Sequence, residues 1–316
     1  GISGGVIPIA VSIGGATVGI AGIIENYGKG GIAGAIAGVR DNFNGAQRPP
    51  RRDPLTLDLD NDGLETVAAS STNPILFDHD GDGLKTGTGW VKSDDGFLVM
   101  DRNGNATIDN GTELFGDATS LYAGGKAADG FAALAQEDTN GDGKVNSTDA
   151  NWSKLRVWRD LNQDGLSQSG ELFTLDALGI AGINVAKTAN SQTLANGNQI
   201  ADLGSYTRTD GTSGTMGEIG SMADVNLADD TFYREFPDQI ALADGVADLP
   251  EMQGSGKVRD LHEAASQSST LKDLLAQYSQ ATTRQAQRAL LDGLLSAWAD
   301  TSGMAKTLQE RGGATN

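Results

Sequence analysis

The sequence predicts an α+β fold in which short strands and acidic loops are followed by a C-terminal helical subdomain. Three observations lead to this prediction. An acidic, glycine-containing motif recurs between residues 55 and 173, short apolar segments precede its first copies, and residues 256–310 show the spacing of amphipathic helices. Because 44 of the 316 residues are glycine and only 5% are aromatic, we expect a thin hydrophobic core.

The composition argues against several classes of function. The formal net charge is −19, so a nucleic-acid partner, which needs a basic face, is not expected. The chain has no cysteine and therefore no disulfide or thiolate metal site. It also lacks an HExxH motif and a Cys–His pair, which argues against a hydrolase that acts on other molecules. The acids cluster with glycines, and this pattern favours binding of hard cations.

Calcium is the cation that the acidic motif predicts. A twelve-residue calcium loop supplies oxygen ligands from positions 1, 3, 5, 7, 9 and 12, with a glycine at position 6 for the sharp turn. The fourth loop, DTNGDGKVNSTD, and the fifth, DLNQDGLSQSGE, fit this pattern throughout. The expected ligands are Asp138, Asn140, Asp142, the Lys144 carbonyl, Asn146 and Asp149 in the fourth loop, and Asp160, Asn162, Asp164, the Leu166 carbonyl and Glu171 in the fifth.

The third loop, DRNGNATIDNGTE, departs from the pattern in two ways. Ala106 replaces the turn glycine, and the closing Glu113 falls at position 13. A pseudo-EF-hand with one additional residue is the expected structure. Its predicted ligands are Asp101, Asn103, Asn105, Asp109 and Glu113.

The first two loops, DLDNDG and DHDGDG, contain only the opening half of the motif. Their predicted ligands are Asp58, Asp60 and Asp62 in the first loop and Asp78, Asp80 and Asp82 in the second. We expect Glu65 to complete the first site and Asp94 or Asp95 to complete the second, while His79 takes no part. The alternative interpretation is a pair of solvated acidic turns. Since unneutralised acids repel one another, folding is predicted to depend on calcium.

The Asp53–Pro54 bond lies five residues before the first predicted ligand. An aspartate carboxylate can attack its own backbone carbonyl, forming a cyclic anhydride and expelling the proline nitrogen. The attack is intramolecular and therefore has a high effective molarity, and proline has no N–H to hold its nitrogen in a hydrogen bond. An acid with a raised pKa is needed to protonate that nitrogen, and the sequence does not identify it. Most Asp–Pro pairs, however, are inert turn residues.

The stretch from DPLTLDLDNDGLETV through LFDHDGDGLKTGTGWVKSDDGFLVMDRNGNATIDNGTELFGD to LRVWRDLNQDGLSQSGEL closely resembles the self-processing module of FrpC-type iron-regulated RTX proteins. This resemblance extends over about residues 53–236 and more weakly through the C-terminal region. It implies calcium-dependent cleavage between Asp53 and Pro54 and capture of the activated aspartyl group by a lysine in an Asp–Lys isopeptide bond. It also implies that the acids Asp138, Asp149, Asp160 and Glu171 are needed for processing.

Four regions are expected on these grounds. Residues 1–48 form a Gly-rich apolar upstream segment, 49–54 a linker with the scissile bond, 55–236 the calcium-binding self-processing module and 237–316 a helical subdomain. The chain starts without methionine and resembles a fragment of a secreted or surface-exposed bacterial protein exported by a type I, toxin-related route. Residues 5–39 are apolar enough for membrane contact, although a flexible connector also explains them.

Two interpretations of function remain open. The first is a self-cleaving module that uses Ca²⁺ and an acceptor lysine, with Lys85, Lys92 and Lys126 as the candidates nearest in sequence. The second is a non-catalytic, calcium-stiffened structural or adhesion module. Both predict a calcium-dependent folding transition, and only the first predicts a new amino terminus at Pro54.

Overall fold

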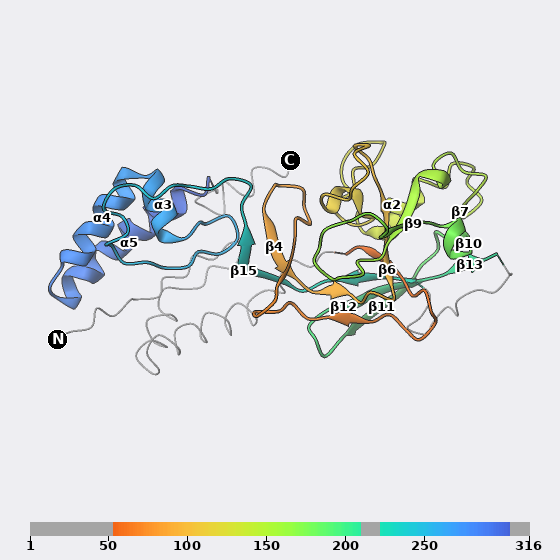
Figure 1. Ribbon diagram of the computed structural model, residues 1–316, viewed down its shortest axis with the longest axis horizontal. Helices are drawn as coiled ribbons and strands as arrows, with labels where there is room; N and C mark the ends of the chain where they lie inside the picture. The colour runs from red at the N-terminus through yellow and green to blue at the C-terminus, as the bar shows by residue number, and fades with distance from the viewer. Residues whose placement is uncertain (1–52, 210–221, 304–316) are drawn as a thin grey trace. The chain divides into compact units, whose positions relative to one another are not determined.

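The largest sheet joins strands that lie far apart in the sequence. The structure is a computed structural model, and it describes residues 53–209 and 222–303 (Figure 1). Seven strands form this sheet, and every neighbouring pair is antiparallel. Their order is β11 (Thr188–Thr193), β12 (Gln199–Gly204), β14 (Met222–Asn226), β1 (Leu55–Leu57), β6 (Gly96–Met100), β8 (Leu155–Trp158) and β9 (Leu172–Thr174).

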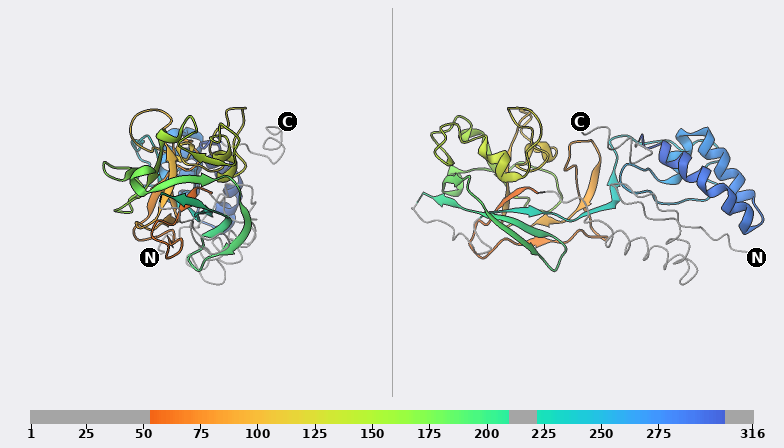
Figure 2. Two further views of the ribbon diagram at one scale, coloured as in Figure 1. Left: turned by 90° about the vertical axis from the view of Figure 1, so that its right-hand side faces the viewer. Right: turned by 180° about the vertical axis from the view of Figure 1, so that it is seen from behind.

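Three smaller antiparallel sheets accompany it in the described part of the chain, and Figure 2 gives two further views of the same ribbon. The first consists of β13 (Tyr206–Arg208), β10 (Ile180–Asn184) and β7 (Lys144–Asn146). The second consists of β15 (Asp229–Glu235), β4 (Lys85–Thr88) and β3 (Ile75–Phe77). The third pairs β2 (Thr66–Val67) with β5 (Trp90–Val91). The helical elements among them are η1 (Gly111–Glu113), α2 (Gly130–Ala135), η2 (Trp152–Lys154) and η3 (Asp176–Leu178).

The seven-stranded sheet carries a hydrophobic cluster on each face. Successive side chains of a strand point to opposite faces, and β6 shows this alternation clearly. Leu98 and Met100 belong to one cluster with Leu55 and Phe131, whereas Phe97 and Val99 belong to the other. The second cluster includes four tightly packed aromatic rings, with ring centroids 4.8 Å apart for Trp90 and Phe97 and 5.4 Å apart for Trp90 and Trp158. The core is therefore more substantial than the low aromatic content suggests.

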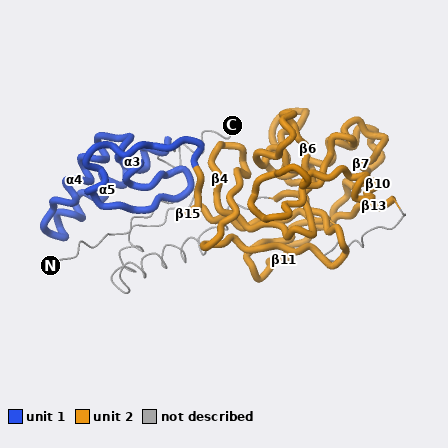
Figure 3. The backbone as a smooth tube through the Cα atoms, in the orientation of Figure 1, with its two compact units in different colours: residues 1–49, 236–316 blue, residues 50–235 orange. Residues whose placement is uncertain are grey.

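The chain divides into two compact units, residues 50–235 and a unit that includes residues 236–316 (Figure 3). In the second unit, helices α3 (Leu261–Gln267), α4 (Ser269–Gln280) and α5 (Arg284–Asp300) bury one apolar cluster. Leu291, Leu294 and Trp298 of α5 are all buried there. The hydroxyl groups of Ser268 and Thr283 cap the first turns of α4 and α5 by accepting backbone N–H groups.

The predicted α+β fold built on EF-hand-like and pseudo-EF-hand loops is wrong. The described residues form fifteen strands in antiparallel sheets, and the longer helices are confined to residues 261–300. An EF-hand places its loop between two helices. Here the first three loops begin directly after β1, β3 and β6, and the fifth begins two residues after β8. The apolar segments before the first and third loops are extended because β1 and β6 pair with strands that are distant in sequence, whereas β3 pairs with β4 directly after the second loop. Strand β8 pairs with β6 in the same way, across more than 50 residues of sequence.

The apolar segment expected at residues 1–48, with its proposed membrane contact at residues 5–39, lies outside the described residues. Among the residues that are described, no helix has the length and apolar character needed to cross a bilayer.

Replacing Trp158 with alanine should lower the free energy of unfolding by about 3–5 kcal/mol, since this fully buried side chain fills the centre of the aromatic cluster. Trp158→Phe is the matched control, because it keeps a ring in place and removes an indole N–H that has no hydrogen-bond partner. Equilibrium urea unfolding measures both effects. Equal losses for the two variants would contradict this account of the core.

Candidate functional site: the Asp53–Pro54 bond and the acidic loops

The Asp53–Pro54 peptide lies at the entry to the central strand β1. Leu55 N–H donates to the Phe115 carbonyl at 2.8 Å, and Val225 N–H of β14 donates to the Pro54 carbonyl at 3.2 Å. Pro54 is buried and Asp53 is half-buried. The residues on the carboxyl side of the bond are therefore fixed between two neighbouring segments, and the first acidic loop begins directly after this strand.

Residues that follow the third loop surround the Asp53 side chain. Asp117 N–H donates to Asp53 Oδ1 at 2.7 Å. A Cβ atom at Gly116 would lie 2.9 Å from the Asp53 carbonyl oxygen and 3.3 Å from its carbonyl carbon, so only glycine fits against the scissile peptide. A small pocket at this point is lined by Asp53, Pro54, Gly116, Asp117 and the second-loop residue His79.

This environment changes the acidity of Asp53. Burial first, and then the negative charge of Asp117, raise the pKa of the Asp53 carboxyl to about 7, although the N–H of Asp117 acts in the opposite direction. Near neutral pH the group is present in both its ionised and its protonated form. A carboxyl with a perturbed pKa that lines a pocket is typical of a functional site.

The five acidic loops share one hydrogen-bond pattern at their first residue. In every loop, the carboxylate of the leading aspartate accepts the backbone N–H of the sixth residue. It also accepts the N–H of the fourth residue, the fifth residue or both. In the fourth loop, for example, Asp138 accepts from Gly141, Asp142 and Gly143 at 2.8–3.1 Å. The leading residues are Asp58, Asp78, Asp101, Asp138 and Asp160.

The five loops also share a backbone conformation, with positive φ at positions 4 and 6. Glycine is favoured there because it has no Cβ, yet Asn61 and Gln163 occupy position 4 and Ala106 occupies position 6 with φ of 65°, 56° and 68°. Ala106 therefore takes up the same conformation as the turn glycines of the other loops. The irregular third loop keeps the shape of its neighbours despite its sequence.

The closing carboxylates of the last three loops bond back to equivalent positions. Glu113 accepts from the N–H groups of Arg102 and Asp109, at positions 2 and 9 of its loop. Asp149 accepts from Thr139 and Asn146, and Glu171 from Leu161 and Gln168, at the same two positions. All three carboxylates are buried, with at most 6% of each residue exposed. The closing acid therefore bonds to the same two loop positions whether it stands at position 12, as in the fourth and fifth loops, or at position 13, as in the third loop.

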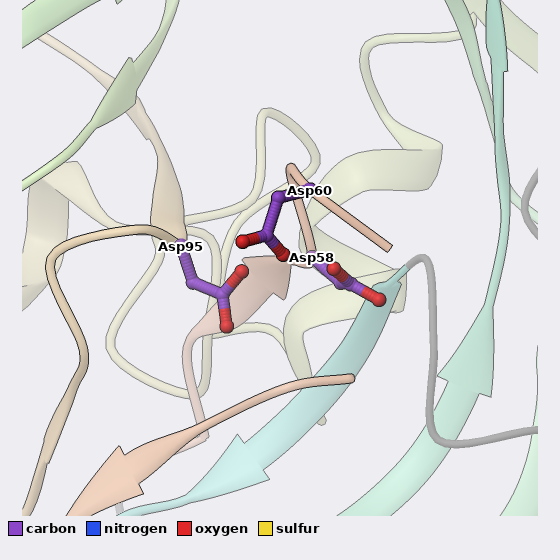
Figure 4. Close-up of side chains that lie close together, drawn as sticks. All are labelled: Asp58, Asp60 and Asp95. Carbon is purple, nitrogen blue, oxygen red and sulfur yellow. The ribbon is translucent and has the colours of Figure 1, made fainter. Parts of the chain in front are cut away.

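The first loop is completed by Asp95. Carboxylate oxygens of Asp58, Asp60 and Asp95 all lie within 4.8 Å of one another, and Asp95 reaches them from the turn before β6 (Figure 4). Glu65, which the sequence suggested for this place, instead pairs with Lys92 at 2.5 Å. Burial raises the pKa of Asp95 to about 7. Three converging carboxylates, two of them almost fully buried, form a group that could hold a metal ion.

The second loop forms its own group from Asp78, Asp80 and Asp82, whose oxygens also lie within 4.8 Å of one another. Among the described residues, neither Asp94 nor Asp95 joins it. His79 is buried, its Nε2 lies 2.9 Å from Thr88 Oγ1, and its ring contacts Phe77, so its side chain belongs to the core. In the third, fourth and fifth loops, the predicted ligands at positions 3 and 5 are exposed to solvent, so a metal ion could reach them from outside.

The candidate acceptor lysines lie on the surface in different settings. Lys85 forms an ion pair with Glu235 at 2.9 Å, and Lys92 forms one with Glu65. Lys126 is exposed, and its backbone forms an isolated antiparallel β-bridge with Ser120. None of the three lines the pocket at Asp53.

Three residues at the scissile bond escaped the sequence reasoning. Gly116 and Asp117 stand in the stretch that carried the family resemblance, but nothing in their spacing singles them out. Asp224, on β14 opposite Leu55, gives no signal in the sequence because it reaches the site only through the pairing of strands.

Comparisons with known proteins relate this arrangement to one family. Residues 55–222 match the SPM domain family, which is more than half of the chain. The chain is also 51% identical over 249 residues to the iron-regulated protein FrpA of Neisseria meningitidis serogroup C. That match covers 79% of this chain and 22% of FrpA, and it supports an FrpA/FrpC-type relationship. The chain therefore belongs to the SPM domain family.

Proposed function

We propose that this chain is a calcium-dependent self-processing module that cleaves its own Asp53–Pro54 bond. The observation that carries the proposal is the position of the Asp53 carboxyl, which is anchored by the Asp117 N–H while Gly116 lies against the adjacent carbonyl. An inert turn would not require such close packing against the peptide. Family membership and the FrpA relationship add support from the sequence side.

The proposed chemistry uses the chain's own groups. A side-chain oxygen of Asp53 attacks the Asp53 carbonyl carbon, the C–N bond to Pro54 breaks, and the proline nitrogen takes up a proton. The products are a five-membered cyclic anhydride and a new amino terminus at Pro54. Water opens the anhydride to the free acid. Alternatively, the ε-amine of a lysine opens it to an amide with loss of one proton, which gives an Asp–Lys isopeptide bond and one free carboxylate.

Calcium has a structural role in this proposal. The residues that would hold it are the acids of the five loops, because their oxygen-rich donor sets suit a hard cation. The bound ion would supply positive charge where the buried carboxylates Asp58 and Asp95 face each other. Folded loops fix both sides of the scissile site, since the first loop follows β1 and the third precedes Gly116 and Asp117.

We further propose that the module works outside the cell, as part of a larger secreted or surface protein. Calcium-dependent folding suits an exported chain, because the cytosol contains little free calcium. The relationship to FrpA supports this setting, and type I secretion is the route we propose.

Adding millimolar calcium to metal-free protein should produce two fragments, the larger starting at Pro54, whereas Asp53→Ala should stay intact because the nucleophile is gone. Asp176→Asn is the control, since Asp176 is exposed and lies outside the loops. Gel electrophoresis and amino-terminal sequencing provide the readout. A wild-type chain that binds calcium and remains whole would instead support a non-catalytic, calcium-stiffened structural module.

Glu171→Gln should raise the calcium concentration needed for half-maximal cleavage by about tenfold or more, because the closing carboxylate of the fifth loop loses its charge. Leu161 and Gln168 donate to different oxygens of Glu171, so the single amide oxygen of glutamine can keep one of these two bonds and loses the other. Calcium titration of the cleavage rate measures the shift. An unchanged calcium dependence would remove Glu171 from the proposed ligands.

Cleavage in the presence of hydroxylamine should give an amino-terminal fragment that ends in an Asp53 hydroxamate, since an anhydride reacts with this amine faster than with water. Mass spectrometry of the fragment detects the product. A fragment that carries only the free acid at every hydroxylamine concentration would mean that water attacks the peptide directly, and that no acyl group is available for lysine.

A further inference from the structure

Asp224 is a buried carboxyl that the fold does not satisfy. Only 1% of the residue is exposed, and its Oδ1 has no hydrogen-bond partner. Its Oδ2 accepts a single long N–H bond from Gly130, at 3.3 Å. An unpartnered buried carboxyl costs stability, and such groups gather where chemistry requires them.

The strand register places Asp224 beside the scissile bond. Asp224 of β14 lies directly opposite Leu55 of β1, so both side chains point to the same face of the sheet. Asp53 precedes Leu55 by two residues and lies just before β1, so continuing the alternation of the strand would turn its side chain to the same face. Asp53 and Asp224 are therefore diagonal neighbours, and the charge of Asp53 acts on Asp224.

The leaving nitrogen also faces β14. Val225 N–H donates to the Pro54 carbonyl, and in an antiparallel ladder the nitrogen and the carbonyl of one residue point to the same neighbouring strand. Proline has no N–H with which to return the bond. The Pro54 nitrogen therefore points toward β14, the strand that carries Asp224, and it has no hydrogen of its own.

The charges around Asp224 favour its protonated form. Burial, followed by the charge of Asp53, raises the pKa of Asp224 well above its ordinary value, and Asp129 and Asp202 raise it further. The nearby cation, Lys187, is bound by Asp129 at 2.6 Å and by Asp202 at 2.8 Å. Because Asp53 and Asp224 repel each other when both are ionised, the negative charge of Asp53 favours the protonated form of Asp224.

We propose that Asp224 donates the proton that the Pro54 nitrogen takes up when the Asp53–Pro54 bond breaks. This role rests on the self-cleavage proposed above. The ionised Asp53 attacks its own carbonyl carbon, Asp224 gives its proton to the nitrogen, and the C–N bond breaks. The products are the anhydride, the neutral Pro54 amine and an ionised Asp224. Hydrolysis of the anhydride then releases protons that return Asp224 to its acid form.

Asp224 does not line the small pocket at Asp53, and the two titratable groups that line it beside Asp53 fit this role less well. Asp117 is only half-buried and contributes its backbone N–H to Asp53, so its carboxyl is more accessible to water than that of Asp224. The Nε2 of His79 lies 2.9 Å from the Thr88 hydroxyl, which directs this nitrogen toward the core. The structure therefore favours Asp224, and variants of Asp117 separate the two acids experimentally.

Asp224→Asn should slow calcium-triggered cleavage of the full chain about 100-fold or more, the range in which a general acid acts. Its thermal unfolding midpoint should stay the same or rise, because the amide removes a buried carboxyl. Asp176→Asn, at an exposed residue outside the loops, is the control and should cleave within a few-fold of wild type. A slow variant with an unchanged or higher midpoint excludes a purely structural role.

The pH dependence of the wild type provides a second test that needs no variant. Cleavage requires one proton on the Asp53–Asp224 pair, so the rate should fall in acid, where Asp53 is protonated, and fall again in alkali, where Asp224 has lost its proton. In Asp224→Asn this optimum should disappear. The residual rate should be level in acid, where the loss of ionised Asp53 offsets the gain in hydronium, and should fall with rising pH once Asp53 is fully ionised.

The outcomes separate the two proposals. A wild type that never cleaves overturns self-cleavage and this inference together. A wild type that cleaves, while Asp224→Asn keeps its rate or the wild-type rate stays level through the alkaline range, overturns this inference alone. A large loss in Asp117→Asn with none in Asp224→Asn assigns the proton to Asp117 and also overturns it.

Discussion

The pairing of β1 with β14 is the interaction on which the arrangement of the site depends. The strand has only three residues, yet it lies between β14 and β6 in the largest sheet. It begins at the scissile bond and ends at the first acidic loop. Its register brings Asp224 opposite Leu55 across about 170 residues of sequence. A shift of one residue would turn every side chain of this short strand to the other face.

Acidic loops and apolar sheet stabilise this arrangement in different ways. The two hydrophobic clusters bury both faces of the sheet, so the core can form by ordinary packing. The loops place buried carboxylates such as Asp58 and Asp95 close together, and their mutual repulsion opposes the same fold. A bound cation would therefore act mainly at the ends of the strands, where the acidic loops begin. It would affect the Asp53–Pro54 peptide indirectly, through the chain segments that connect this peptide to the first and third loops.

The local structure of the loops was largely predictable from sequence, whereas the fold was not. Alternating acids with a glycine at position 6 indicate a tight turn, and all five loops contain one. Even so, Ala106 and Gln163 adopt positive φ that their residue types do not suggest, because the hydrogen bonds of the leading aspartate determine the turn. The α+β prediction failed because β1, β6, β8 and β14 pair over long sequence distances. Asp95 and Asp224 reach their places only through such pairings, which no local pattern reports.

The hydrogen bonds around β1 are distributed unequally on the two sides of the scissile peptide. After scission, Pro54 and Leu55 would remain in the sheet through their bonds to Val225 and Phe115. The acyl group of Asp53 would keep the single described bond to Asp117. The amine that could reverse the reaction would thus stay immobilised in the sheet, unable to follow the departing acyl group. Such an asymmetry would make the proposed reaction directional, because the activated end would be released toward external amines while its former partner is retained.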